Sequence, residues 1–196
     1  MTKKKPGNMR IKEIIQAAVE EFLEKGYNGA SMNSIAARAG LSKGGLYHHF
    51  SGKDEILMAA NDEFARPVHD LVHRTAAVDN PVEALTLYIR EYLHHWSTHE
   101  KELAFTFLTM TKIISCRGMW PQMEDYSTGV MAFYESLFKK GIEKGLLRHH
   151  DTAARALTLM AALDGITAYL VMGHTFPLEK TVEHFLVTYI GDIEIK

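Results

Sequence analysis

The chain has 196 residues, of which 46% are hydrophobic, and its net charge at pH 7 is −2. This length exceeds that of one minimal DNA-binding module and allows a well-buried core or two small lobes. Helix-forming residues predominate, only 5 residues are proline, and no alternating run of β-branched residues indicates a strand. We therefore predict an all-α fold of about nine helices.

The charged residues are distributed unevenly along the chain. Residues 1–53 hold nine basic and four acidic side chains, whereas the remaining residues hold 13 basic and 20 acidic ones. A basic segment beside an acidic body is typical of a protein that presents one end to phosphates. The single cysteine, Cys116, cannot form an internal disulfide, and no signal peptide opens the chain. Since Asp164 interrupts the longest apolar stretch, we expect a cytoplasmic protein without a membrane span.

The first predicted helix covers about residues 9–25. Ile14, Ala18 and Phe22 lie on one face of it at helical spacing, and three lysines precede it as a basic arm. Gly26 is expected to end the helix, because glycine readily adopts the left-handed conformation that follows a helix.

Two short helices are predicted next, within residues 31–53. Ser31 is placed to cap the first of them, and Gly40 supplies the left-handed turn that ends it. Ser42 is placed to cap the second. Two helices that cross steeply through a short glycine-containing turn are typical of the helix-turn-helix, whose second helix lies in the major groove of DNA.

The second of these helices has an inner and an outer side. Leu46 and Phe50 occupy the inward positions, which leaves Lys43, Tyr47 and His48 on the outer side. A cation, an aromatic hydroxyl and an imidazole on one exposed face suit contact with DNA phosphates and base edges.

The rest of the chain is predicted to be helical. A fourth helix begins at Ser51, where a Ser-x-x-Asp arrangement with Asp54 resembles a capping box, and Pro67 is expected to bend or divide it. Asn80 followed by Pro81 predicts the next start. The later helices are expected at about 101–115, 126–145, 152–173 and 178–190. We divide the chain into a helix-turn-helix domain, 1–53, and a helical effector-binding and dimerisation domain, 54–196.

The run SMNSIAARAGLSKGGLYHHFSGKDEIL, residues 31–57, resembles the N-terminal signature of the tetracycline-repressor (TetR/AcrR) family of bacterial transcriptional regulators. The resemblance implies that several of these side chains contact DNA phosphates. It also implies that the recognition helix begins, at Ser42 and Gly44, where it meets the groove. Gly45 stands where many relatives carry a side chain that touches a base, so DNA deformability and phosphates are expected to contribute part of the specificity. The implied DNA-binding residues are Ser31, Ser42, Lys43, Gly44, Gly45, Tyr47, His48 and Lys53.

The body is rich in aromatic residues and methionines. One interpretation is an ordinary core, and the other is a cavity for a small, mainly apolar or aromatic molecule, which the resemblance also implies. The candidate lining residues are Tyr92, Trp96, Phe107, Met110, Trp120, Met123, Tyr126 and Tyr134.

The last two predicted helices, 152–173 and 178–190, are apolar over much of their surface and include Leu157, Phe185 and Ile190. A helix that is apolar most of the way round must be buried, and a terminal pair has few partners left within its own chain. We therefore predict a homodimer through these helices. With two recognition helices in successive grooves it would bind a near-palindromic operator, and the resemblance makes repression, relieved by the effector, the default.

The sequence offers weaker signals for two other kinds of function, metal binding and catalysis. The pairs His69 and His73, and His95 and His99, are each four residues apart and suit a shared metal ion, but no cysteine or carboxylate completes either set. We expect no metal and no cofactor. No nucleophile–base pair, phosphate loop or carboxylate pair indicates an enzyme. A DNA-binding regulator without a small ligand, controlled by a protein partner or a metal, remains the alternative.

Overall fold

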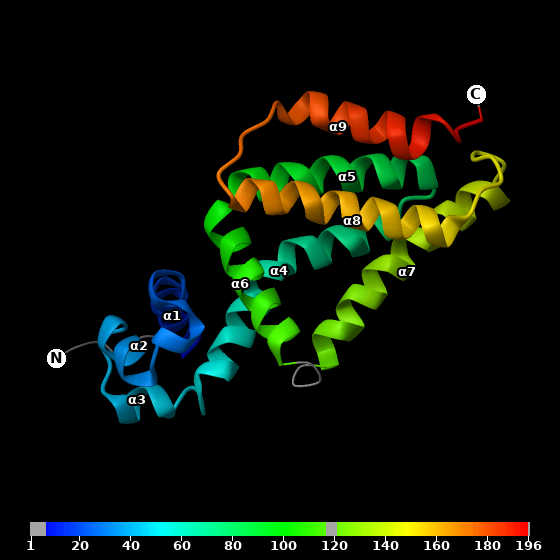
Figure 1. Ribbon diagram of the computed structural model, residues 1–196. Coiled ribbons are helices and arrows are strands. Elements are labelled where there is room, and N and C mark those ends of the chain that lie inside the picture. Colours follow the sequence, from blue (N-terminus) through cyan, green and yellow to red (C-terminus); the bar gives the residue numbers. More distant parts are fainter. Residues whose placement is uncertain (1–6, 117–120, 196) are drawn as a thin grey trace. The chain divides into compact units, whose positions relative to one another are not determined.

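The computed structural model of the chain describes residues 7–116 and 121–195 (Figure 1). Within these residues the chain forms nine α-helices and one π-helical turn, and no strand longer than an isolated bridge between Leu147 and Glu194. This confirms the predicted all-α fold.

The chain packs as two compact units. The first comprises Met1–Arg66 and Ala104–Arg117, and the second comprises Pro67–Leu103 and Gly118–Lys196. The first unit therefore extends past residue 53 and takes in a segment from the middle of the chain. The functional boundary between residues 53 and 54 stays a prediction.

Helix α1 (Gly7–Gly29) opens the first unit, and its regular part ends at the predicted place. Gly26 has φ 70° and ψ 166°, which breaks the helical path after Lys25. One further helical turn follows the break, with the N–H of Ala30 donating to the Gly26 carbonyl at 3.1 Å, before the next helix begins. A positive φ is tolerated here because glycine has no Cβ.

The helix-turn-helix is formed by α2 (Met32–Arg38) and α3 (Lys43–Tyr47). The turn between them depends on Gly40, which has φ 62°. Leu46 and Phe50 are buried, as the spacing predicts.

The core of the first unit joins residues that are far apart in the sequence. Phe105 of α6 (Glu100–Ser115) is fully buried in it, with its ring 6.1 Å from that of Phe22 and 5.4 Å from that of Phe64. The other fully buried members include Ile14, Ile35, Leu46, Ile56 and Leu57. From Ala104 onward, α6 thus belongs to the first unit, and Phe105 is part of the core beneath the helix-turn-helix.

Helix α4 (Lys53–Ala76) differs from the prediction at its start. The backbone N–H and the hydroxyl of Ser51 donate to the Glu55 carboxylate at 2.7 and 2.8 Å. Asp54 instead accepts a hydrogen bond from the hydroxyl of Tyr27. The predicted pairing of Ser51 with Asp54 was wrong, because a second carboxylate next to it reaches back more directly. The helix also continues through Pro67 as one element.

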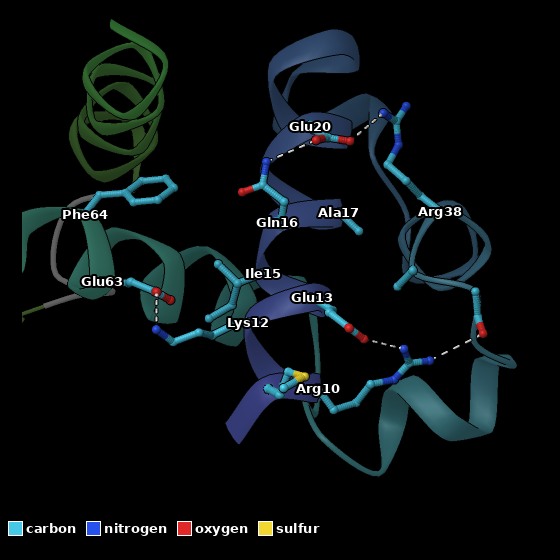
Figure 2. Close-up of a pocket in the computed structure, with 13 residues that line it drawn as sticks. Arg10, Lys12, Glu13, Ile15, Gln16, Ala17, Glu20, Arg38, Glu63 and Phe64 are labelled. Carbon is cyan, nitrogen blue, oxygen red and sulfur yellow. Dashed lines mark hydrogen bonds and ion pairs between the residues drawn. The ribbon is translucent and has the colours of Figure 1, made fainter. Parts of the chain in front are cut away.

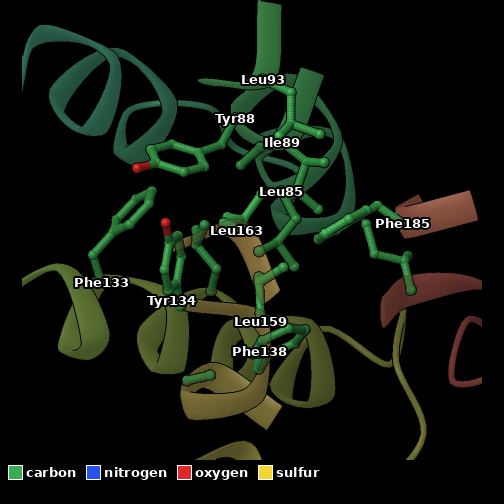
Figure 3. Packing of buried hydrophobic residues seen from close by; sticks show 14 of the residues in the cluster. Leu85, Tyr88, Ile89, Leu93, Phe133, Tyr134, Phe138, Leu159, Leu163 and Phe185 are labelled. Carbon is green, nitrogen blue, oxygen red and sulfur yellow. The ribbon is translucent and has the colours of Figure 1, made fainter. Parts of the chain in front are cut away.

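The second unit contains α5 (Pro81–Thr98), α7 (Pro121–Glu143), α8 (Thr152–Val171), α9 (Leu178–Leu186) and a π-helical turn, Val187–Gly191. Helix α5 begins as predicted, with the Asn80 side chain accepting from the N–H groups of Val82 and Glu83. Its core gathers residues from α5, α7, α8 and α9 (Figure 3), among them Leu85, Tyr88, Ile89, Phe138, Leu159, Leu163 and Phe185.

The end of the chain is tied back onto this unit. Arg155 of α8 makes two hydrogen bonds to the Asp192 carboxylate, at 3.0 and 3.1 Å. The backbone N–H of Arg148 donates to the carbonyl of Ile193 at 2.7 Å. These bonds fix the register of the last two helices within the chain.

The apolar surfaces of the last two helices are divided between the core and solvent. Phe185 and Ile190 are 7% and 3% exposed, so they pack inside their own chain and not on a free face as predicted. Helix α5 supplies the partner that the prediction overlooked. The large apolar residues that remain exposed here include Leu157, Tyr169 and Val171 of α8, Met172 at its end, and Val187 after α9.

Candidate nucleic-acid interface

Both helices of the helix-turn-helix begin with a serine cap. The Ser31 hydroxyl accepts from the N–H of Ser34 at 3.1 Å, and the Ser34 hydroxyl accepts from the N–H of Ser31 at 3.0 Å. The Ser42 hydroxyl accepts from the N–H of Gly45 at 3.1 Å. These caps satisfy N–H groups at the ends of the helices and fix where each begins. Ser31 and Ser42 are themselves exposed.

The outer side of α3 is open to solvent. Lys43 and His48 are exposed, and the ring of Tyr47 is 47% exposed with the Lys43 ammonium 5.9 Å from its centre. This short helix and its C-cap, His48, therefore present a cation, a phenol and an imidazole together. Such groups donate hydrogen bonds to phosphate oxygens and base edges.

The two glycines of α3 occupy different surroundings. A Cβ at Gly44 would meet nothing within 4 Å, whereas one at Gly45 would lie 3.3 Å from the Ser42 hydroxyl and 3.4 Å from Leu41 Cδ2. Gly45 thus lies against the cap of its own helix. Gly44 leaves the backbone open to an approaching surface.

Lys53, the last of the implied DNA-binding residues, is half-buried. Its ammonium donates to the backbone carbonyls of Tyr27 and Ala30, at 2.8 and 3.1 Å. The structure therefore gives it partners inside the protein that the sequence did not indicate.

An ionic network on α1 holds the end of α2. Arg38 donates from Nε to buried Glu21 at 3.0 Å, and from its two terminal nitrogens to the Glu24 carboxylate. Hydrogen bonds from Lys25 and Ser34, assisted by the charges of Lys25 and Arg38, lower the pKa of Glu21 despite its burial. Sequence reasoning missed this network, although the cluster of acids late in the first helix was a signal for a basic partner.

Beside this network lies an open hollow of about 790 Å³ (Figure 2). Its charged side chains are paired with each other: Arg10 binds Glu13 at 2.7 Å, and Lys12 lies 3.6 Å from Glu63. Arg10 also donates to the Gly40 carbonyl at 3.4 Å. The hollow is therefore a self-neutralised surface that ties α1 to the turn of the motif.

The predicted effector-binding residues divide into three groups. Trp120 and the side chains of Met123 and Tyr126 lie outside the described residues. Phe107 and Met110 lie in the part of α6 that belongs to the first unit, and Met110 is 48% exposed.

Tyr92, Trp96 and Tyr134 belong to the second unit and pack around Tyr88 and one another. Figure 3 shows Tyr88, Phe133 and Tyr134 gathered in the core. None of the eight candidates lines either of two surface hollows, of about 790 and 380 Å³. An effector pocket stays a prediction.

The histidine pairs were the candidates for metal binding. The rings of His95 and His99 stack with centres 4.3 Å apart. Across residues 7–116 and 121–195, no three His, Cys, Asp or Glu side chains converge in a way that would hold a metal ion.

The capped pair α2–α3, with its basic and aromatic outer face, defines a helix-turn-helix DNA-binding regulator. Comparison with known proteins supports this class. Residues 14–60 match the family model described as bacterial regulatory proteins, tetR family.

Two relatives that are transcriptional regulators match this chain over most of their length. The chain is 26% identical over 157 residues to the transcriptional repressor BepR of Brucella suis, covering 78% of this chain and 75% of that one. It is 29% identical over 188 residues to the transcriptional regulator PksA of Bacillus subtilis, covering 94% and 89%.

Among solved structures, the complex of SmeT with triclosan matches with a TM-score of 0.78 and 23% identity, covering 96% of this chain and 93% of that one. SmeT is the repressor of a multidrug efflux pump of Stenotrophomonas maltophilia. This likeness concerns the fold alone. Residues 14–60 thus form a domain of the tetR family of bacterial regulatory proteins, and over most of its length the chain resembles transcriptional regulators.

Proposed function

We propose that this regulator is a repressor that binds a near-palindromic operator as a homodimer and is released by a small, mainly apolar or aromatic effector. The observation that carries the DNA-binding part is the exposed outer face of α3, with Lys43, Tyr47 and His48 on a serine-capped helix. Relatives that are repressors favour repression over activation. A cytoplasmic location follows from this function.

The exposed apolar residues of α8 support the dimer. Leu157, Tyr169 and Met172 are 55%, 56% and 69% exposed, on a helix whose other side is already buried in the second unit. The mean hydropathy of α8 reaches 1.3, enough for a membrane span by composition, but one apolar helix is weak evidence of one. A second copy of the chain is the partner that a regulator of paired half-sites needs, since recognition helices about 34–36 Å apart reach successive major grooves.

The effector part is supported by a likeness of fold to SmeT, whose complex contains triclosan. Release requires that the effector bind the DNA-free state more tightly than the DNA-bound state, and the ratio of these affinities sets the loss of operator affinity. If protein saturated with a stabilising compound bound operator as tightly as the free protein, release would be the wrong mechanism.

DNA binding is tested by selecting duplexes from a random pool with the wild-type protein and measuring their affinity by fluorescence anisotropy. We expect near-palindromic sites, and Lys43→Met should weaken binding and reduce the slope of log affinity against log salt by about 1. Lys139→Met is the matched control, because Lys139 lies in α7 and is paired with Glu135. Selection of no duplex would refute the proposal.

The dimer is tested by light scattering on the purified protein. Leu157→Asp should convert a dimer into a monomer, because it places a charge in the centre of an apolar interface. Leu87→Asp is the control, since Leu87 is also exposed, at 36%, but lies on α5. A wild-type monomer, or equal effects of both changes, would exclude this interface.

A further inference from the structure

Lys53 begins α4, and its ammonium lies against the last turn of α1, after the break at Gly26, and against Ala30, which leads into α2. It donates to the Tyr27 carbonyl at 2.8 Å and to the Ala30 carbonyl at 3.1 Å, and it lies 4.2 Å from the centre of the Tyr27 ring. All three residues belong to the first unit. The ammonium therefore has two hydrogen-bond acceptors and an aromatic face before any DNA arrives.

These contacts distinguish Lys53 from Lys43. Hydrogen bonds to a charged donor are stronger than those between neutral groups, and an ammonium over an aromatic ring gains further attraction. A phosphate would have to replace these contacts to take the Lys53 ammonium. Lys43 is exposed, and its contact with a described residue is the Tyr47 ring at 5.9 Å.

The segment held by Lys53, residues 27–30, leads directly into the cap of α2. Ala30 is 3% exposed, and Ser31 follows it. The hydroxyl and the carbonyl of Ser31 accept from the N–H groups of Ser34 and Ile35 at 3.1 and 2.9 Å, which forms the first turn of the helix. The position of the Ala30 carbonyl thus sets where Ser31 and the N–H groups behind it point.

Tyr27 is fixed from its other end as well. Its hydroxyl donates to Asp54, the residue after Lys53, and burial together with this bond raises the Tyr27 pKa. The first two residues of α4 therefore hydrogen-bond to the same tyrosine: Lys53 binds its backbone carbonyl, and Asp54 binds its hydroxyl.

We propose that Lys53 is a positioning residue for DNA binding: it holds Ser31 and the start of α2 in the geometry that meets a backbone phosphate, and it does not itself serve as the phosphate contact. The inference rests on the proposed DNA-binding function. It departs from the role that the family resemblance assigns to this lysine.

The first test needs no DNA. Amide hydrogen exchange is measured for Ser34 and Ile35 in the free protein, in wild type and in Lys53→Met. We expect at least about tenfold faster exchange in the variant, because two charge-assisted bonds behind the cap are lost. Lys112→Met is the matched control: the Lys112 ammonium lies 4.4 Å from the same Tyr27 ring, but it is not bonded to the two carbonyls among the described residues. Exchange in this control should stay within about twofold of wild type.

The second test uses a duplex selected by the wild-type protein. Lys53→Met should weaken binding about fivefold or more while the salt slope stays that of wild type, whereas Lys43→Met should reduce the slope by about 1. A slope reduced by about 1 in Lys53→Met, with unchanged exchange at Ser34 and Ile35, would overturn the proposal.

Tyr27→Leu provides a second variant that leaves the lysine in place, for the case that Lys53→Met does not fold. A positioning role predicts faster exchange and weaker DNA binding, because the ring beneath the ammonium is gone. A phosphate contact predicts equal or tighter binding, since the ammonium is then freer to reach DNA. If the wild-type protein selected no duplex, the proposed function would fail, and the exchange measurement would still decide whether Lys53 holds the start of α2.

Discussion

The close approach of α7 to the loop that follows it makes Gly141 the most sharply testable position of the second unit. A Cβ added there would lie 2.4 Å from Cδ1 and 2.7 Å from Cγ of Leu147. Leu147 has little freedom to retreat, because it is 2% exposed and its N–H donates to the Gly141 carbonyl at 3.0 Å. Gly141→Ala should therefore destabilise the protein.

The expected magnitude comes from two opposing effects. Overpacking of a buried site costs about 1–3 kcal/mol, and the higher helix propensity of alanine returns up to about 1 kcal/mol. The net loss of about 1–2 kcal/mol corresponds to a fall in Tm of about 2–8 °C for a chain of this size. Gly129 in the same helix has nothing within 4 Å of an added Cβ. Gly129→Ala should therefore stabilise the protein by about 0.5–1 kcal/mol.

The assay is thermal unfolding followed by circular dichroism. The two alanine substitutions should move Tm in opposite directions, so the sign is the test. Adding Leu147→Ala to Gly141→Ala should cost less than Leu147→Ala does in the wild type, because the clash disappears with the larger side chain. A rise in Tm for both single variants would refute the argument from close packing.

Three further predictions concern the DNA-binding unit. Gly44→Ala should raise Tm slightly, since its Cβ meets open space. It should also weaken binding to selected DNA, because the methyl group projects from the recognition helix. Unchanged DNA affinity would contradict this prediction. Arg38→Met should lower Tm at pH 7, because it leaves the buried carboxylate of Glu21 without its guanidinium partner. Chemical denaturation gives the free energy of unfolding of both proteins. A decrease below about 1 kcal/mol would show that the ionic network contributes little to stability. The Tm difference between wild type and Arg38→Met should also shrink as the pH falls below about 4.5: Arg38 lowers the Glu24 pKa in the folded state, so this stabilisation is present above the unfolded pKa and lost as Glu24 protonates. An equal difference at pH 7 and pH 3.5 would exclude that coupling.

The helix-turn-helix was predictable because its signals are local. Serine caps, a left-handed glycine and a 3.6-residue period act over a few residues, and Ser31, Gly40 and Leu46 each lie where these signals place them. The exposure of Tyr47 followed from the burial of its neighbours by the same periodicity.

What the sequence did not reveal depends on contacts between distant segments. Nothing near Lys53 indicates that the carbonyls of Tyr27 and Ala30 lie within reach of its ammonium. Phe185 appeared to be free for a dimer, because apolar periodicity shows that a face is buried but not against which partner. The choice between Asp54 and Glu55 at the start of α4 likewise depended on where Tyr27 lies.

The burial of Phe105 in the core of the first unit has a consequence for protein engineering. To graft the DNA-binding unit of one relative onto the second unit of another, the obvious junction lies within α4, near residue 66. In such a chimera the grafted DNA-binding unit would pack against α6 of the recipient protein, and so against the recipient's residue in the place of Phe105. Exchange of DNA specificity between relatives should therefore succeed only when residues 104–116 are transferred together with the DNA-binding unit, although they lie nearly forty residues further along the chain.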